Sequence, residues 1–560
     1  MHTDTADLAD PSRPGSADGD GGPGKGKLAS GIARGALIVS LLTAFSRVLG
    51  LLRTVVFAHT VGSGCLGTAY VTANQVPNLI VELAIGGALS SAMVPVLARA
   101  ANRAAADPGA KGHVEQVSSA LLTWSALILL PVTLAITVAA GPISQLLNPA
   151  NPNAACAHGD MIKETSFLLV SFAPQILLYG ISVVLFGLLQ AYRRFTAVSL
   201  APVLGNVVTI SCYLLFGSLD HSATLARTPL AANLVLSIGT TMNIGMMVIV
   251  SLPAVWRLRL RWRPTLRFPS GVLSRASGLA LVGVLEFLAA DIYGVITIDL
   301  ANGRGDTGAL VLVNYGNLVF TAMCSVLPLA IITSAFPVLA ATEGDAFDRT
   351  SAGTTRAVVL MCWLSTAVMV AVAGPAAHVL THDKGQVSQL TEAFLLFAPG
   401  ISGYGLVTNL SRVLFALGKL RVAGVGLVLQ QLLPAALSFP LVLLTPPTFT
   451  VAALALASSA GMLALNIPMV VATRRLRGPA AVAGVGRAEL AGVAAAAAGA
   501  AVGLAVTLVL PAGGSIFEVG AGAVSAVLAV AVFGVVAYAL DKEDMRVAVG
   551  RLRRLVRSSP

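Results

Sequence analysis

Long apolar stretches, separated by short polar segments, run through most of the chain. Each stretch is about 20 residues long, the length that a helix needs to cross roughly 30 Å of hydrocarbon. The pattern predicts fourteen membrane-spanning helices. Their predicted limits are 36–59, 68–97, 117–140, 165–188, 196–218, 231–252, 273–300, 309–340, 355–376, 390–411, 422–444, 450–472, 488–510 and 516–540.

Two short sequences recur so that helix n resembles helix n+6. Residues 172–180 of the fourth predicted helix begin Phe-Ala-Pro and match residues 397–405 of the tenth. Pro-Val-Leu-Ala occurs at 95–98 in the second helix and at 337–340 in the eighth. Because six is an even number, the two copies share one orientation, related by an axis along the membrane normal. We therefore predict an all-α polytopic membrane protein with two parallel six-helix repeats and two extra C-terminal helices.

The same pattern predicts how the chain is divided. Residues 1–34 are rich in Gly, Pro, Asp and Ser, a composition typical of disorder. The predicted segments are a disordered cytoplasmic tail (1–34), an N-terminal six-helix lobe (35–254), a basic cytoplasmic linker (255–272), a C-terminal six-helix lobe (273–473), helices thirteen and fourteen (474–540) and a basic cytoplasmic tail (541–560).

Composition and charge support a membrane protein and orient it. Hydrophobic residues make up 56% of the chain and charged residues 11%, against about 25% charged in soluble domains. If the N-terminus is cytoplasmic, thirty of the 36 Lys and Arg fall in cytoplasmic segments. This bias predicts that both termini are cytoplasmic. The net charge of +11 then reflects topology and attraction to membrane lipids, and it gives no reason to expect a nucleic acid partner.

The sequence shows no arrangement of catalytic or metal-binding residues. The cysteines and histidines have no metal-ligand spacing, and no Walker A motif is present, so ATP is not expected to drive the protein directly. Cys65 and Cys156 both fall in predicted exterior loops, and the sequence leaves undecided whether they form a disulfide. We therefore expect a protein that is not an enzyme and binds no cofactor or metal.

Two arginines lie inside the first predicted helix. A charge at the centre of a membrane helix costs roughly 2.5 to 3.5 kcal/mol on insertion scales. Arg47 is near the centre, and Arg53 is six residues later, about 9 Å further outward and about 120° around the helix. The planar guanidinium binds phosphate oxygens in a bidentate manner, so both are candidate phosphate ligands. The alternative is structural pairing with Glu82 or with acids of the seventh helix.

Other polar residues occur within predicted helices. Glu286 and Asp291 in the seventh helix are candidates for coupling to an ion, because buried carboxylates in transporters often bind ions or protons. Their alternative role is to balance the charge of the two arginines. Asn78, which follows Pro77 in the second helix, offers a neutral hydrogen-bonding group near mid-depth.

These residues resemble a known family. Residues 45–50 with Arg53, then 77–79, then Gly87-Ala88 and Pro95, resemble the first two helices of the MurJ (MviN) lipid II flippases, which belong to the MOP superfamily of exporters. The resemblance implies a central cationic cavity lined by helices one, two, seven and eight. It also implies a hydrophobic groove at helices thirteen and fourteen for a polyprenyl tail. Arg47 and Arg53 would hold the diphosphate, and the cavity would include Ser46, Asn78, Glu82 and Asn317.

The chain also departs from the family pattern. Thr54 and Thr68 stand where members often have acids, and Val81 stands where a basic residue is typical. The Asn317-Leu318 region replaces an expected arginine in the eighth helix. The predicted cavity is therefore less basic than the family pattern.

The function expected from the resemblance is a flippase that moves undecaprenyl-diphosphate-linked peptidoglycan precursor, lipid II, to the outer leaflet of a bacterial plasma membrane by alternating access. Coupling to the membrane potential, Na⁺ or H⁺ stays open, and the cell-wall synthesis machinery is an expected partner. A flippase for another lipid-linked oligosaccharide shares the same physics. A multidrug-type cation antiporter is disfavoured, since its cavity should favour acids and aromatics. A membrane glycosyltransferase would need an acid in a sizeable exterior loop, and the longest, 141–164, has only Asp160 and Glu164.

Overall fold

A computed structural model of the protein describes residues 23–83, 111–220, 225, 228–266, 277–381, 383–509 and 514–542. Thirteen segments in these ranges are helices long and apolar enough to cross a membrane. They correspond to predicted helices one and three to fourteen. The second predicted helix starts as α2 (Cys65–Val81), and its end lies outside the described residues. The predicted helical class is confirmed.

The N-terminal half packs as one bundle. Its helix α8 contacts both α1 and α9, and α7 packs between α4 and α9. This half comprises α1 (Pro23–Thr60), α2, α4 (Lys111–Val138), α5 (Ala140–Leu147), α6 (His158–Phe172), α7 (Pro174–Ala191), α8 (Phe195–Leu219) and α9 (Leu230–Trp256).

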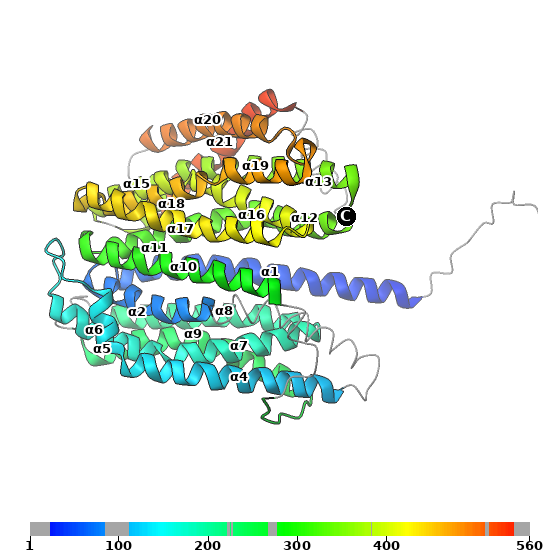
Figure 1. Ribbon diagram of the computed structural model, residues 1–560. Coiled ribbons are helices and arrows are strands. Elements are labelled where there is room, and N and C mark those ends of the chain that lie inside the picture. Colours follow the sequence, from blue (N-terminus) through cyan, green and yellow to red (C-terminus); the bar gives the residue numbers. More distant parts are fainter. Residues whose placement is uncertain are drawn as a thin grey trace, which may run out of the picture.

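The C-terminal half forms a second bundle, and α1, α10 and α11 lie between the remaining helices of the two halves (Figure 1). Helix α17 contacts α10, α16 and α18, and the last two long helices, α20 and α21, pack on α13. The helices are α10 (Ser277–Arg304), α11 (Ala309–Val326), α12 (Pro328–Ala341), α13 (Gly344–Ala371), α14 (Ala373–Leu380), α15 (Lys384–Phe397), α16 (Gly400–Ala416), α17 (Leu420–Leu444), α18 (Thr450–Leu463), α19 (Asn466–Arg477), α20 (Val485–Val509) and α21 (Ser515–Leu540), with the short 3-10 helices η3 (Pro447–Phe449) and η4 (Pro479–Val482).

The repeated Phe-Ala-Pro sequence marks a helix break in each half. Helix α6 ends before Pro174, and α15 ends before Pro399, because proline lacks the N–H that would continue the hydrogen-bond ladder. A hydroxyl from elsewhere in the bundle bonds to a carbonyl just before each break. Thr241 Oγ1 donates to the Ser171 carbonyl at 2.9 Å, and Ser459 Oγ donates to the Leu396 carbonyl at 2.5 Å. The two carbonyls stand at equivalent positions of the repeat.

The structure extends helices beyond the predicted limits. Helix α1 begins at Pro23, within the segment predicted to be a disordered tail, and residues 1–22 lie outside the described residues. The predicted exterior loop 141–164 is partly helical, because α5 covers its start and α6 its end. An Ala-Gly-Pro sequence begins both α5 and α14, a further trace of the repeat.

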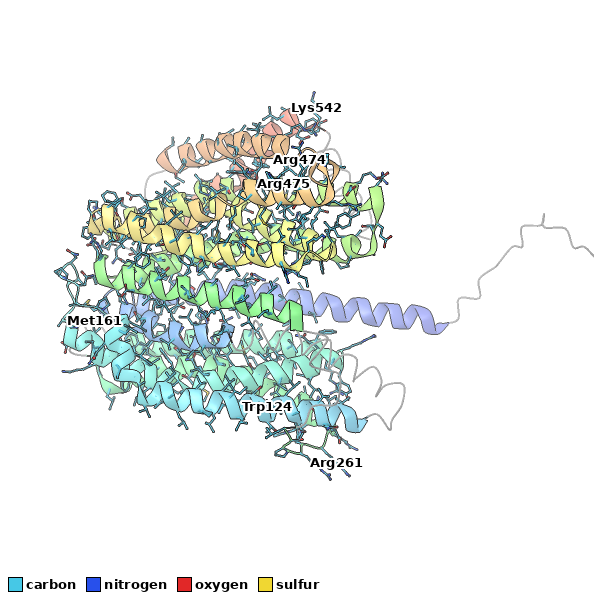
Figure 2. All side chains as sticks on the ribbon, viewed as in Figure 1. Trp124, Met161, Arg261, Arg474, Arg475 and Lys542 are labelled. Atoms are coloured by element: carbon cyan, nitrogen blue, oxygen red, sulfur yellow. A yellow bond between two sulfur atoms is a disulfide. The ribbon has the colours of Figure 1, made fainter. Side chains whose placement is uncertain are left out.

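Basic residues gather toward one end of the bundle. Arg261, Arg474, Arg475 and Lys542 lie toward this end, and Met161 lies toward the opposite end (Figure 2). The linker after α9 runs along α4: the backbone N–H of Arg261 donates to Glu115 Oε1 at 3.0 Å. We call the opposite end, which carries residues 61–64, the predicted exterior end.

Candidate functional site

A cavity of about 380 Å³ lies between the N-terminal half and α11 of the C-terminal half. Most of its wall comes from α1, α2, α7, α8 and α9. The lining residues are Arg53, Thr54, Phe57, Tyr70, Val71, Asn74, Gln75, Asn78, Gln175, Tyr179, Tyr213, Thr240, Asn243, Ile244, Asn314, Tyr315, Asn317, Leu318 and Thr321. This wall is mainly neutral and polar, and Arg53 is the one charged residue in this described lining.

A tyrosine network forms part of the wall beside Arg53. The hydroxyl of Tyr70 is 2.7 Å from the hydroxyl of Tyr213 and 2.8 Å from Oγ1 of Thr240. The Phe57 ring packs against both tyrosines, with ring centroids 5.0 Å and 5.4 Å away. The Arg53 guanidinium interacts electrostatically with the hydroxyls of Tyr70 and Tyr213. The network therefore fixes hydroxyl groups near the cation. Sequence reasoning did not single out these tyrosines.

The structure brings three of the predicted site residues to this cavity. Arg53, Asn78 and Asn317 line it. Arg47 and Ser46 lie on α1 but outside the lining; Arg47 is exposed, about 9 Å along the helix from Arg53 toward the basic end. The backbone carbonyl of Ser46 accepts a hydrogen bond from Asn206 Nδ2 at 3.3 Å.

The predicted acidic residues do not line the cavity. Glu82, at the end of α2, is exposed, and Glu286 and Asp291 on α10 are half-buried. Among the residues the structure describes, none of the three forms an ion pair with Arg47 or Arg53. Glu286 instead interacts electrostatically with Arg412, and Asp291 with Glu82.

The seventh predicted helix, α10, was expected to line the cavity, and no residue of its described part does so. It packs against α17 of its own half, which explains why the expectation was wrong. Helices α7, α8 and α9 occupy the wall in its place.

An apolar hollow adjoins the polar cavity. Its volume is about 340 Å³, and α1, α11, α14 and α21 line it, through residues that include Leu51, Val319, Pro375 and Ala523. Thr54 and Leu318 line both spaces, so the two share a wall. The resemblance implied a groove at helices thirteen and fourteen. Here α21 contributes, whereas no residue of α20 appears in this lining.

The two halves meet beyond the cavity at the predicted exterior end. Asn302 of α10 donates its Nδ2 to Oγ1 of Thr72 at 3.0 Å and to the Leu147 carbonyl at 2.9 Å. Ser63 Oγ donates to Oε1 of Gln386. Gly308 adopts a φ of +92°, and a Cβ there would lie 2.1 Å from the Ser63 carbonyl oxygen. A side chain at this position would push the two halves apart.

A loop held by a disulfide adds to this closure. We call residues 148–157 the gate loop. Asn151 Nδ2 donates to the carbonyls of Asn302 and Gly305, both at 2.8 Å, and the Ala155 N–H donates to Thr307 Oγ1 at 2.9 Å. A disulfide joins Cys156 of the gate loop to Cys65 at the start of α2. The sequence alone did not decide whether these two cysteines pair. In the structure they form a disulfide, which anchors a loop that binds the opposite half.

Comparison with known proteins identifies relatives over most of the chain. The family profile "Lipid II flippase MurJ" matches residues 57–541. A probable lipid II flippase MurJ from Synechocystis sp. is 28% identical over 422 residues, covering 70% of this chain and 73% of the relative. A solved structure of a lipid II flippase MurJ in an inward closed conformation has a TM-score of 0.68 at 14% identity, covering 90% of this chain and 99% of that one. An inward-facing multidrug MATE transporter of the MOP superfamily has a TM-score of 0.59 at 12% identity, with coverages of 77% and 95%.

Proposed function

The chain belongs to the lipid II flippase MurJ family, and we propose that its cavity carries the headgroup of lipid II from the inner to the outer leaflet by alternating access. The observation that carries this proposal is Arg53 in the wall of a polar cavity that shares a wall with an apolar hollow. A polyprenyl-diphosphate-linked glycan needs both environments at once. Its headgroup is anionic and polar, whereas its tail is as apolar as the lipid around it.

Arg53 is proposed to bind the diphosphate inside the cavity. A guanidinium offers several N–H donors to phosphate oxygens, and such charge-assisted bonds are about twice as strong as neutral ones. Arg47 is exposed further along α1 and is proposed to meet the headgroup first. The tail is proposed to remain in the hollow beside Thr54 and Leu318 while the headgroup moves.

The basic end of the bundle is proposed to face the cytoplasm. The positive-inside bias supports this orientation. The Cys65–Cys156 disulfide at the other end also supports it, since disulfides persist in oxidising compartments outside the cell. The arrangement would then be closed toward the exterior, the state in which a transporter receives substrate from the inner leaflet.

The membrane potential is a proposed source of energy. Moving one negative charge outward across a membrane that is negative inside releases about 2.3 kcal/mol per 100 mV. A diphosphate headgroup carries more than one such charge. The acids Glu286 and Asp291 lie on α10 outside the lining described here, so a Na⁺ or H⁺ coupling through them would act on the movement of the halves rather than on the headgroup directly.

Depletion of the protein in its native cell tests the proposal. Loss of the protein should cause lipid II to accumulate, identified by mass spectrometry of extracted lipids, and wild-type protein should reverse this. Accumulation of a different lipid-linked oligosaccharide, with lipid II at its normal level, would assign the protein to that substrate instead. An immunoblot of the membrane fraction should confirm that the protein is lost on depletion and that the rescuing wild-type protein returns to its normal amount.

A further inference from the structure

We propose that α2 and α11 form a subsite that binds the glycan portion of the headgroup through side-chain carboxamides. This inference rests on the proposed function, because it assigns a part of that substrate to a part of the cavity. It concerns five residues that line the cavity from the two facing helices, namely Asn74, Gln75, Asn78, Asn314 and Asn317.

The hydrogen-bonding capacity of these carboxamides is unused. Within the part of the chain that the structure describes, none of the five makes a side-chain hydrogen bond. Two buried carboxamides elsewhere in the bundle are bonded to protein: Asn409 Nδ2 donates to Thr355 Oγ1 at 2.9 Å, and Gln430 Nε2 donates to the Tyr404 carbonyl at 3.1 Å. The five in the cavity are instead left to a ligand or water.

The repeat places this group on equivalent helices. Helix α2 starts the second predicted span and α11 starts the eighth, which are related as n and n+6. Gln75 precedes Pro95 by the same number of residues as Asn317 precedes Pro337. Two matched carboxamides, one on each half, therefore face one cavity. A ligand that bonds to both would connect the two halves that alternating access must move.

The chemistry of the wall matches a glycan. A carboxamide has two N–H donors and an oxygen acceptor, so it can donate to and accept from neighbouring hydroxyls or an acetamido group of a sugar. The described lining contains no Lys, Asp or Glu, so the charged groups of a peptide would find no counter-charge apart from Arg53. Tyrosine rings offer apolar faces for sugar C–H groups, with hydroxyls at their edges.

Tyr315 marks the part of this subsite nearest the tyrosine network. It is 4% exposed, lines the cavity, and its hydroxyl has no hydrogen-bond partner among the described residues. The hydroxyls of Tyr70 and Tyr213, in contrast, bond to each other. A buried hydroxyl without a partner is unfavourable, so a ligand hydroxyl that reaches Tyr315 supplies what the protein lacks.

A binding experiment with two lipids tests the subsite. Purified full-length protein is titrated with lipid II and, separately, with undecaprenyl diphosphate, which carries the tail and diphosphate without the glycan and its attached peptide, so that the variants below assign the difference to the glycan-facing side chains. Sites built to hydrogen-bond a substrate discriminate strongly against analogues that lack those groups. Wild-type protein should therefore bind lipid II at least 10-fold more tightly than undecaprenyl diphosphate.

The variant carrying both Gln75→Leu and Asn317→Leu should lose most of this difference. Each lost hydrogen bond weakens lipid II binding by about 3- to 10-fold, while undecaprenyl diphosphate should bind within twofold of wild type. Tyr315→Phe, which removes one oxygen, should reduce the difference by about 3-fold. The conservative pair Gln75→Asn and Asn317→Gln should retain part of it. Gln190→Leu and Tyr192→Phe, both outside the cavity lining, serve as matched controls and should bind as wild type.

The outcomes separate the subsite from the function. If wild-type protein binds neither lipid, the proposed function is wrong and the subsite with it. If wild-type protein binds both lipids equally, or if the Leu variant weakens both to the same degree, the flippase proposal stands and the glycan subsite is wrong. Because Tyr315→Phe alters neither size nor packing greatly, a folding defect in the double variant would leave this second test in place.

Discussion

Asn302 on α10 donates a hydrogen bond to the buried hydroxyl of Thr72 on α2, with 3.0 Å between Nδ2 and Oγ1. The two residues belong to different halves of the repeat and lie beside the gate loop. The same Nδ2 also donates to the Leu147 carbonyl. One carboxamide thus joins the C-terminal half to two elements of the N-terminal half, at the end that we propose to be exterior.

Removing this carboxamide should weaken the exterior closure. In Asn302→Ala, the Thr72 hydroxyl and the Leu147 carbonyl lose their partner, at a cost of about 1 to 3 kcal/mol for buried groups. A cysteine at Asn74, in the cavity, should then react several-fold faster with an impermeant thiol reagent added outside intact cells. Asn153→Ala removes only a 3.4 Å contact of the gate loop and should have little effect. Equal labelling of both variants would show that Asn302 does not hold the closure.

A covalent link across the same interface should stop transport. Ser63 and Gln386 bond to each other across the two halves, so cysteines at both positions lie within reach of a short bis-methanethiosulfonate crosslinker, which joins two thiols through reducible bonds. Crosslinking should lock the exterior closure and abolish translocation, and reduction should restore it. The single-cysteine variants Ser63→Cys and Gln386→Cys control for the substitutions themselves. Unchanged translocation by fully crosslinked protein would rule out rocking between these halves.

The native disulfide should stabilise the folded protein. Joining Cys65 to Cys156 closes a sequence separation of 91 residues, and disulfides over long loops typically contribute about 2 to 4 kcal/mol to the free energy of unfolding. The purified protein should therefore melt at a lower temperature in dithiothreitol. The variant with both Cys65→Ser and Cys156→Ser should already melt at that lower temperature and should not respond to the reductant. If dithiothreitol lowered the melting temperature of the serine variant by the same amount as that of wild type, the effect would come from something other than this disulfide.

Cysteine labelling tests the proposed orientation of the chain. In a background without reactive cysteines, Leu225→Cys and Lys384→Cys should react with an impermeant reagent outside intact cells, because both lie in predicted exterior segments. Arg261→Cys and Arg475→Cys should react only after the cells are opened. External labelling at position 261 in intact cells would overturn both the topology and the fourteen-helix count.

The hydrophobic pattern was sufficient for the helical class and for most helix positions, because a membrane span must satisfy its own backbone hydrogen bonds. The Phe-Ala-Pro repeat was visible in the sequence. What it did not reveal is that each proline breaks its helix and that Thr241 and Ser459 bond to the carbonyls before the breaks. Such contacts join residues far apart in the chain, and no local pattern reports them.

The cavity was predicted less completely than the fold. Arg53 and Asn78 were singled out because a charge and an amide stand out in apolar helices, Asn317 was named through the family resemblance, and these three line the cavity. The acids of α10 stood out for the same reason, yet they lie elsewhere, since the rotation of a helix depends on its packing partner. The helical spacing of Asn74 with Asn78, and of Asn314 with Asn317, could have indicated a polar face on α2 and on α11.

Translocation of fluorescent lipid II in proteoliposomes, with the purified protein as the only protein present, tests the central claim most directly. Wild-type protein should move the lipid, and Arg53→Ala should do so about 10- to 100-fold more slowly, since a charge-assisted hydrogen bond contributes about 1.5 to 3 kcal/mol. Arg53→Lys should retain part of the rate, because it keeps the charge without the bidentate geometry, and Arg421→Ala, at the exposed start of α17, should match wild type. Failure of the wild-type protein to move lipid II, or an unchanged rate in Arg53→Ala, would contradict the account.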